Sequence, residues 1–228
     1  MDKLIVHVDI SEAYRYLGGV GTPDPGLASE LQRAAAAVVD AASPRFVEKL
    51  CLIKRDNGTC LEGTNLCLEG RSIAALLHDC DRCMILCATI GSGVDALVRK
   101  WQVTDSAFAA MIDACASSAV ESLCDGIEVA LKEEYAPLSL YLTDRFSPGY
   151  GDLPLSIQPA FCAVLDTARK IGVTVSESCM MTPKKSVTAI IGLSHNPQRH
   201  YDTGCRDCSQ IKSCKFRENG VSCYGRAL

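Results

Sequence analysis

The segment from residue 143 to 151 carries side chains suited to binding a small charged ligand. Arg145 presents a planar guanidinium that can donate two charge-assisted hydrogen bonds to a carboxylate or a phosphate. Gly149 has no side chain, so a ligand can approach the backbone, and Tyr150 adds an aromatic ring and a hydroxyl. Pro148 stiffens the turn. The pattern indicates a ligand with a carboxylate at one end and a planar ring at the other; a surface turn with a solvated arginine is the alternative.

A second group of reactive side chains lies near the C-terminus. Four cysteines fall within 19 residues there, interspersed with basic residues: Cys205, Cys208, Cys214 and Cys223. Thiolates in such a segment can converge on one metal, and tetrahedral sulfur ligation suits zinc or an iron–sulfur cluster. The spacing is not that of a zinc ribbon, so a reduced tail that binds no metal is the alternative.

The remaining cysteines and one glycine pair have plainer interpretations. Cys80, Cys83 and Cys87 lie in or beside a continuous apolar run, which favours buried thiols over ligands. Seven others lie in apolar or periodic contexts and are predicted to be core residues: Cys51, Cys60, Cys67, Cys115, Cys124, Cys162 and Cys179. Gly91 and Gly93 open a helix after a predicted strand, but without the second βαβ step of a dinucleotide site they predict a plain strand-to-helix turn.

Helices and strands are predicted to follow each other without a regular βαβ rhythm. Periodicity and end signals predict helices at residues 9–17, 27–43, 71–79, 91–101, 105–134 and 156–169. Apolar or β-branched runs predict strands at residues 4–8, 46–54, 60–68, 83–90, 139–143 and 186–193. We therefore expect an α+β fold with a mixed or antiparallel sheet and flanking helices, as a single domain over residues 1–202, and a small Cys-rich appendage at residues 203–228.

Composition and charge exclude several classes of protein. The 228 residues are 48% hydrophobic and 22% charged, as in folded globular proteins and unlike disordered ones. The formal net charge of −4 gives no basic field for nucleic acid or for an anionic membrane. No run of about 18 apolar residues predicts a membrane span. The N-terminus lacks the pattern of a secretory signal, so we expect a cytoplasmic protein with mostly reduced thiols.

Three segments together resemble the reactivation domain of cobalamin-dependent methionine synthase. Residues 145–150 (Arg-Phe-Ser-Pro-Gly-Tyr) resemble the family's Arg-x-x-x-Gly-Tyr loop. Residues 120–125 (Val-Glu-Ser-Leu-Cys-Asp) are similar to its Ala-Glu-x-x-Ala-Glu stretch. Residues 176–187, followed by the Ser-His pair at 194–195, are similar to its Thr-Glu-Ser…Met-x-Pro-x-x-Ser-Val…Ser-His run. The order and approximate spacing agree over residues 105–202.

The resemblance implies a module that binds S-adenosylmethionine and presents it to a cobalamin held elsewhere. In the family, one-electron reduction coupled to methyl transfer from the sulfonium restores methyl-Co(III) from oxidised Co(II), a methyltransferase-type activity within a multi-protein system. By motif position, Arg145 is expected to bind the methionine carboxylate, and the backbone at Ser147, Gly149 and Tyr150 to line the adenosyl end. Glu121 is expected to face the ligand's ammonium or sulfonium group, unless it is only an exposed helical glutamate.

The resemblance also implies partners. The sequence contains no Asp-x-His-x-x-Gly cobalamin motif and no room for a barrel of about 250 residues, so a stand-alone module is expected. A corrinoid-binding methionine synthase or another corrinoid protein, and an electron donor such as flavodoxin or ferredoxin, would be separate chains. Two departures from the family pattern fall in the loop, where Ser147 and Gly151 replace the common Ala and Pro.

Two other functions stay open at this point. One is an iron–sulfur or zinc accessory protein for corrinoid activation or electron transfer, in which the cysteine tail dominates. The other is an interaction domain that kept the fold and lost ligand binding.

Overall fold

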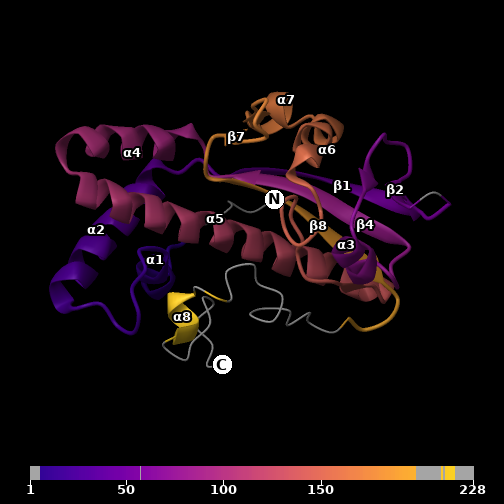
Figure 1. Ribbon diagram of the computed structural model, residues 1–228, viewed down its shortest axis with the longest axis horizontal. Coiled ribbons are helices and arrows are strands. Elements are labelled where there is room, and N and C mark those ends of the chain that lie inside the picture. Colours follow the sequence, from indigo (N-terminus) through magenta and orange to yellow (C-terminus); the bar gives the residue numbers. More distant parts are fainter. Residues whose placement is uncertain (1–5, 57, 199–211, 213, 219–228) are drawn as a thin grey trace. The chain divides into compact units, whose positions relative to one another are not determined.

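The structure is a computed structural model that describes residues 6–56, 58–198, 212 and 214–218 (Figure 1). Its contacts divide the chain into two compact units. The first is built on the residues before Pro44 and on the segment Ile90–Leu123, and the second on Pro44–Thr89 and the segment that begins at Cys124. The long helix α5, Ser106–Tyr135, therefore contributes to both units.

Capping side chains fix the starts of the helices in the first unit. The Asp9 carboxylate accepts two backbone N–H bonds at the start of α1 (Ile10–Tyr16), and Asp24 does the same for α2 (Pro25–Ala41). Asp105 caps α5 in a similar way, because its Oδ1 accepts the Phe108 N–H at 2.9 Å. These helices match the predicted ranges closely.

Helix α4 (Ser92–Thr104) begins at the glycine pair singled out in the sequence. A Cβ atom at Gly93 would lie 2.5 Å from the Ala41 carbonyl oxygen, and one at Gly91 would lie 3.1 Å from the Ser43 carbonyl oxygen. The glycines therefore allow α4 to approach the end of α2, and the interpretation as a plain strand-to-helix turn is confirmed.

The predicted strand at residues 4–8 is wrong for the part that the structure describes. Residues 6–9 form no strand. The backbone N–H of His7 instead donates to Ser122 Oγ, and that of Asp9 donates to Ser118 Oγ, both at 3.0 Å. Hydroxyls of α5 thus take the hydrogen bonds that a neighbouring strand would have taken, which the apolar pattern could not reveal.

The second unit contains an antiparallel sheet in the order β3-β2-β1-β4-β8-β5 among the described residues. Its strands are β1 Arg45–Lys54, β2 Thr59–Leu61, β3 Cys67–Leu68, β4 Arg82–Thr89, β5 Tyr141–Leu142 and β8 Ser186–Ser194. A separate hairpin pairs β6 (Thr174–Val175) with β7 (Met181–Thr182). The predicted α+β class with an antiparallel sheet is confirmed.

Two predicted elements of this unit are each divided in the structure. The predicted strand at residues 60–68 becomes β2 and β3, because Thr64 forms a turn in which its hydroxyl donates to the Leu61 carbonyl at 2.7 Å. The predicted helix at residues 156–169 becomes a 3-10 turn (Leu155–Ile157), α6 (Gln158–Leu165) and α7 (Thr167–Ile171). Asp166 separates the two helices with a left-handed backbone, φ 55°.

One face of the sheet packs against short helices. Alternate β4 residues Cys83, Ile85 and Cys87 form a buried cluster with side chains of α3 (Arg71–Leu76), α6 and α7. The ring of Phe161 on α6 is fully buried in this cluster. Figure 1 shows α6 and α7 on the same side of β1 and β4. This core holds the sheet edge from which the candidate loop departs.

Among the described residues, one helix, α5 with the turn that follows it, is long and apolar enough to cross a membrane. This stretch, Ser106–Leu138, includes the 3-10 turn Ala136–Leu138. However, 61% of its most apolar 18-residue segment is buried inside the protein. Burial of this kind is typical of a core helix.

Candidate functional site

The candidate loop leaves β5 along the edge of β8. The Thr143 N–H donates to the Gly192 carbonyl at 2.9 Å, and Phe146 exchanges two hydrogen bonds with Ile190 at 2.8 and 2.9 Å. Thr143 and Phe146 are three positions apart, whereas their partners on β8 are only two positions apart. The loop therefore contains one extra residue, around Arg145. Such a bulge bends an edge strand and redirects its side chains, as is common beside functional sites.

The Arg145 side chain is directed to two carboxylates of α5. Its Nη2 donates to Asp125 Oδ1 at 2.7 Å, and its Nε lies 3.6 Å from Glu128 Oε2. The two acidic residues are three positions apart on one helix face. Glu128 also accepts from Lys132 Nζ at 2.7 Å. The Arg145 side chain is only 21% exposed, whereas that of Asp125 is 68% exposed. The guanidinium is therefore held in place within a charged network.

The turn after Arg145 places three predicted residues together. The Tyr150 N–H donates to the Ser147 carbonyl at 3.0 Å, and the Gly149 N–H donates to the Leu153 carbonyl at 2.9 Å. Gly149 has φ 91°, a value that favours glycine. The Tyr150 ring is 58% exposed and meets the Phe146 ring edge-on at 6.3 Å between centroids. The exposed ring of Tyr150 thus directly follows Gly149, which has no side chain.

Gly151, which follows Tyr150, differs from the family pattern in a way that the backbone explains. Gly151 has φ 53°, which the proline common in the family cannot adopt.

The carboxylate of Asp152 accepts the N–H groups of Ser72 and Arg71 on α3. These backbone hydrogen bonds lower the pKa of Asp152 to about 2. No pattern in the sequence indicates this role of Asp152.

Glu121 lies on α5 but belongs to the first unit. Its charge contributes to a raised pKa of Tyr16, for which burial and the adjacent Glu12 are larger causes. The Tyr16 hydroxyl donates to Glu12 Oε1 at 3.0 Å. The structure therefore places Glu121 in a cluster with α1, and its predicted contact with a ligand stays a prediction.

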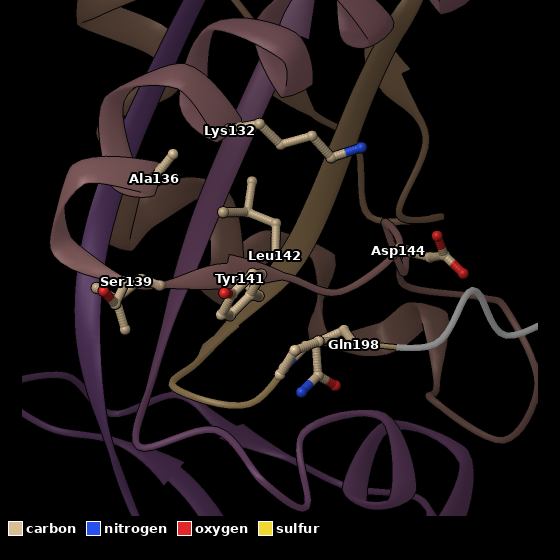
Figure 2. A pocket seen from close by; sticks show the side chains of 9 residues that line it. Lys132, Ala136, Ser139, Tyr141, Leu142, Asp144 and Gln198 are labelled. Atoms are coloured by element: carbon tan, nitrogen blue, oxygen red, sulfur yellow. The ribbon is translucent and has the colours of Figure 1, made fainter.

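A pocket of about 390 Å³ opens where α5 ends and β5 begins. Its lining comprises Lys132, Ala136, Ser139, Leu140, Tyr141, Leu142, Asp144, Pro197 and Gln198. In Figure 2, Lys132 extends from α5 toward the end of the pocket at which the Asp144 carboxylate lies. The predicted ligand-binding residues do not line this pocket. Two lining residues are nevertheless connected to Arg145: Asp144 directly precedes it in the chain, and Lys132 forms an ion pair with Glu128, the carboxylate that Arg145 Nε also approaches.

The predicted metal site falls mostly outside the described residues, since Cys205, Cys208 and Cys223 are not among them. Cys214 is described; it is partly buried and directly precedes the four-residue helix α8, Lys215–Glu218. Within the part of the chain that the structure describes, no group of three His, Cys, Asp or Glu side chains could hold a metal ion. The four-cysteine ligand set, like the boundary at residues 202–203, stays a prediction from the sequence.

The other cysteines largely follow expectation. The buried free thiols are Cys51, Cys80, Cys83, Cys87, Cys115, Cys124 and Cys162. The prediction is wrong for Cys60 and Cys67, which form a disulfide between β2 and β3, and for Cys179, which is only partly buried. Cys60 and Cys67 are opposite each other in the strand register at the sheet edge, where an apolar sequence context does not ensure burial.

Comparison with known proteins identifies the family. Residues 36–219 match the family model described as "Vitamin B12 dependent methionine synthase, activation domain". The chain therefore belongs to the family of vitamin B12-dependent methionine synthase activation domains, as the three sequence segments indicated. No curated protein matches the chain.

A solved structure shares the fold. The chain is similar to "Crystal Structure of the MetH Reactivation Domain bound to AdoHcy", with a TM-score of 0.63 and 18% sequence identity over 95% of this chain and 82% of that one. At this identity the likeness shows the fold alone.

Proposed function

We propose that this chain binds S-adenosylmethionine at the Arg145 loop and supports reductive remethylation of an oxidised corrinoid held by a methionine synthase or another corrinoid protein. The observation that carries the proposal is the guanidinium of Arg145, held beside an open Gly149-Tyr150 turn in a member of the activation-domain family. The bound S-adenosylhomocysteine named for the similar solved structure supports the same ligand class.

The charges at the loop are complementary to those of the proposed ligand. S-adenosylmethionine carries one carboxylate, one ammonium and one sulfonium group. The Arg145 guanidinium supplies the cation for the ligand carboxylate, and its planar fork of N–H donors matches carboxylate geometry. Asp125 and Glu128 supply negative charge within the same network for the ligand's two cationic groups. The arrangement therefore fits a zwitterion with an additional positive charge.

The turn fits the other end of the ligand. The N–H groups of Gly149 and Tyr150 donate within the turn, so an adenosyl group there would meet the exposed Tyr150 ring and backbone carbonyls. Aromatic rings stack well on planar bases. Gly149 leaves its backbone uncovered, because a Cβ atom there would meet only Leu155 within 4 Å.

The roles of the chain in the reaction are binding and orientation. The carbon–sulfur bond of the sulfonium breaks, the methyl group passes to the corrinoid, and S-adenosylhomocysteine leaves as a neutral thioether. The corrinoid supplies the cobalt that accepts the methyl group, and a one-electron donor such as flavodoxin or ferredoxin supplies the electron that the oxidised cobalt requires. Arg145 holds the amino-acid end of the ligand so that its methyl group is presented outward.

A reductive methylation assay tests the proposal. A corrinoid protein in the Co(II) state is incubated with the chain, a one-electron reductant and S-adenosylmethionine labelled in the methyl group. We expect label on the corrinoid and an equal amount of S-adenosylhomocysteine, and neither when the chain or the reductant is omitted. Label transfer that does not depend on the chain would contradict the proposed function.

A further inference from the structure

The carboxylate of Asp152 joins the candidate loop to the start of α3. Asp152 Oδ2 accepts the Arg71 N–H at 2.7 Å, and Oδ1 accepts the Ser72 N–H at 2.9 Å. The residue before α3 is Gly70, which has no side chain to cap the helix. The first N–H groups of α3 thus find their acceptor in a residue about 80 positions later in the chain.

Two glycines allow this close approach. A Cβ atom at Gly70 would lie 2.8 Å from Asp152 Oδ1 and 2.9 Å from the Asp152 carbonyl oxygen. One at Gly151 would lie 2.9 Å from Ser72 Oγ. Both glycines also have positive φ, 133° and 53°. The loop and α3 therefore fit together only because neither backbone carries a side chain at the contact.

The turn that carries Gly149 and Tyr150 is anchored on both sides. Before it, Phe146 exchanges two hydrogen bonds with Ile190 of β8. After it, the Asp152 carboxylate is bonded to α3, and the Leu153 side chain is buried in the cluster beneath the sheet. Between these anchors Gly149 and Tyr150 are exposed, so the position of the Tyr150 ring depends on them.

We propose that Asp152 is a positioning residue for ligand binding, which fixes the Gly149-Tyr150 turn by bonding to α3 without touching the ligand. The inference rests on the proposed function for the identity of the ligand. A turn that is already ordered loses less conformational entropy when the ligand binds, so the anchor contributes to affinity. The lowered pKa of Asp152 agrees with this role, because the carboxylate stays ionised and able to accept both bonds down to strongly acidic pH.

The test compares Asp152→Ala with Asp152→Asn, which keeps one acceptor oxygen. The matched control is Asp24→Ala, because Asp24 likewise accepts two N–H bonds, from Gly26 and Leu27, at the start of α2 in the other unit. Two readouts are measured on the full chain. One is amide hydrogen exchange at Gly149, Tyr150 and Leu153 without ligand, and the other is the Kd for S-adenosylmethionine from calorimetric titration.

We expect Asp152→Ala to speed exchange at these amides and to raise the Kd roughly tenfold, with a smaller effect for Asp152→Asn and no effect on either readout for Asp24→Ala. Unchanged exchange in Asp152→Ala would overturn the positioning role whatever the ligand. Faster exchange with an unchanged Kd would overturn the link to binding. A wild-type chain that binds no S-adenosylmethionine would overturn the proposed function and, with it, the ligand part of this inference.

Discussion

Arg145 and Asp125 form an ion pair of 2.7 Å that joins the candidate loop to helix α5. The two residues are 20 positions apart, and the pair orients a guanidinium that is otherwise mostly covered. Because a flexible arginine loses side-chain entropy when it is fixed, this pair prepares the cation for the carboxylate of the proposed ligand.

The first prediction follows from that pair. Asp125→Asn is expected to weaken S-adenosylmethionine binding by about three- to tenfold, because it replaces the ion pair that anchors Arg145 by a neutral hydrogen bond and removes a negative charge beside the ligand's cationic groups. The free energy of unfolding should change by less than about 1 kcal/mol, since the carboxylate is exposed. Titration calorimetry measures the first quantity and urea denaturation the second. Tighter binding would show that Asp125 competes with the ligand. Glu133→Gln, at an exposed position of the same helix, is the control.

Acid titration of stability tests Asp152 independently of any ligand. Its pKa is lowered from 3.8 in the unfolded chain to about 2, so the carboxylate contributes stability that is fully present above about pH 4 and is lost as the pH falls toward 2. Asp152→Asn should therefore be less stable than wild type near neutral pH, and the difference should shrink over that acidic window. Thermal denaturation across the window measures it. A difference that stays constant would contradict the lowered pKa.

The disulfide between Cys60 and Cys67 is expected to stabilise the sheet edge. The two residues are seven positions apart. Closing so short a loop lowers the conformational entropy of the unfolded chain, which raises the free energy of unfolding by about 2 kcal/mol. Reduction of the wild-type protein should lower the free energy of unfolding by that amount in urea denaturation. The double variant Cys60→Ser/Cys67→Ser should show no response to reductant. Equal stability of the oxidised and reduced wild type would contradict the prediction.

Alkylation should distinguish the buried thiols from an accessible one. Burial raises the pKa of Cys80 to about 11 and raises that of Cys83 further, while a hydrogen bond with Cys162 and burial raise that of Cys87. Iodoacetamide should therefore modify Cys179 in the native chain well before these three, because thiolates react and buried thiols do not form them. Peptide mass spectrometry measures the order. Early modification of Cys83 would show that the core opens readily.

The sequence predicted the long elements well because their apolar patterns agree with their burial. Strands β1, β4 and β8 and helices α2 and α5 lie close to their predicted ranges. The β6–β7 hairpin was missed, because strands of two residues carry too little pattern to be read. The break at Asp166 was also missed, since a left-handed aspartate has no signature within an apolar helical pattern.

The candidate site was predicted only in part, and for a clear physical reason. Arg145, Gly149 and Tyr150 could be proposed because one short loop contains them. The partners Asp125 and Glu128 are on a distant helix, and although Asp125 belongs to a segment that resembles the family, nothing in the sequence places it opposite Arg145. Asp152 was missed because a single acidic residue after a glycine gives no sign that it caps a helix about 80 positions earlier.

The most direct test of the central claim is calorimetric titration of the wild-type chain, Arg145→Ala and Arg169→Ala with S-adenosylmethionine. Arg169 is an exposed arginine of α7 that pairs only with Asp166 among the described ion pairs, and so controls for loss of a positive charge. We predict saturable binding to the wild type and to Arg169→Ala, and affinity at least about tenfold weaker in Arg145→Ala, because the ligand carboxylate loses its charge-assisted partner. Binding of equal strength in all three proteins, or in none, would contradict the account.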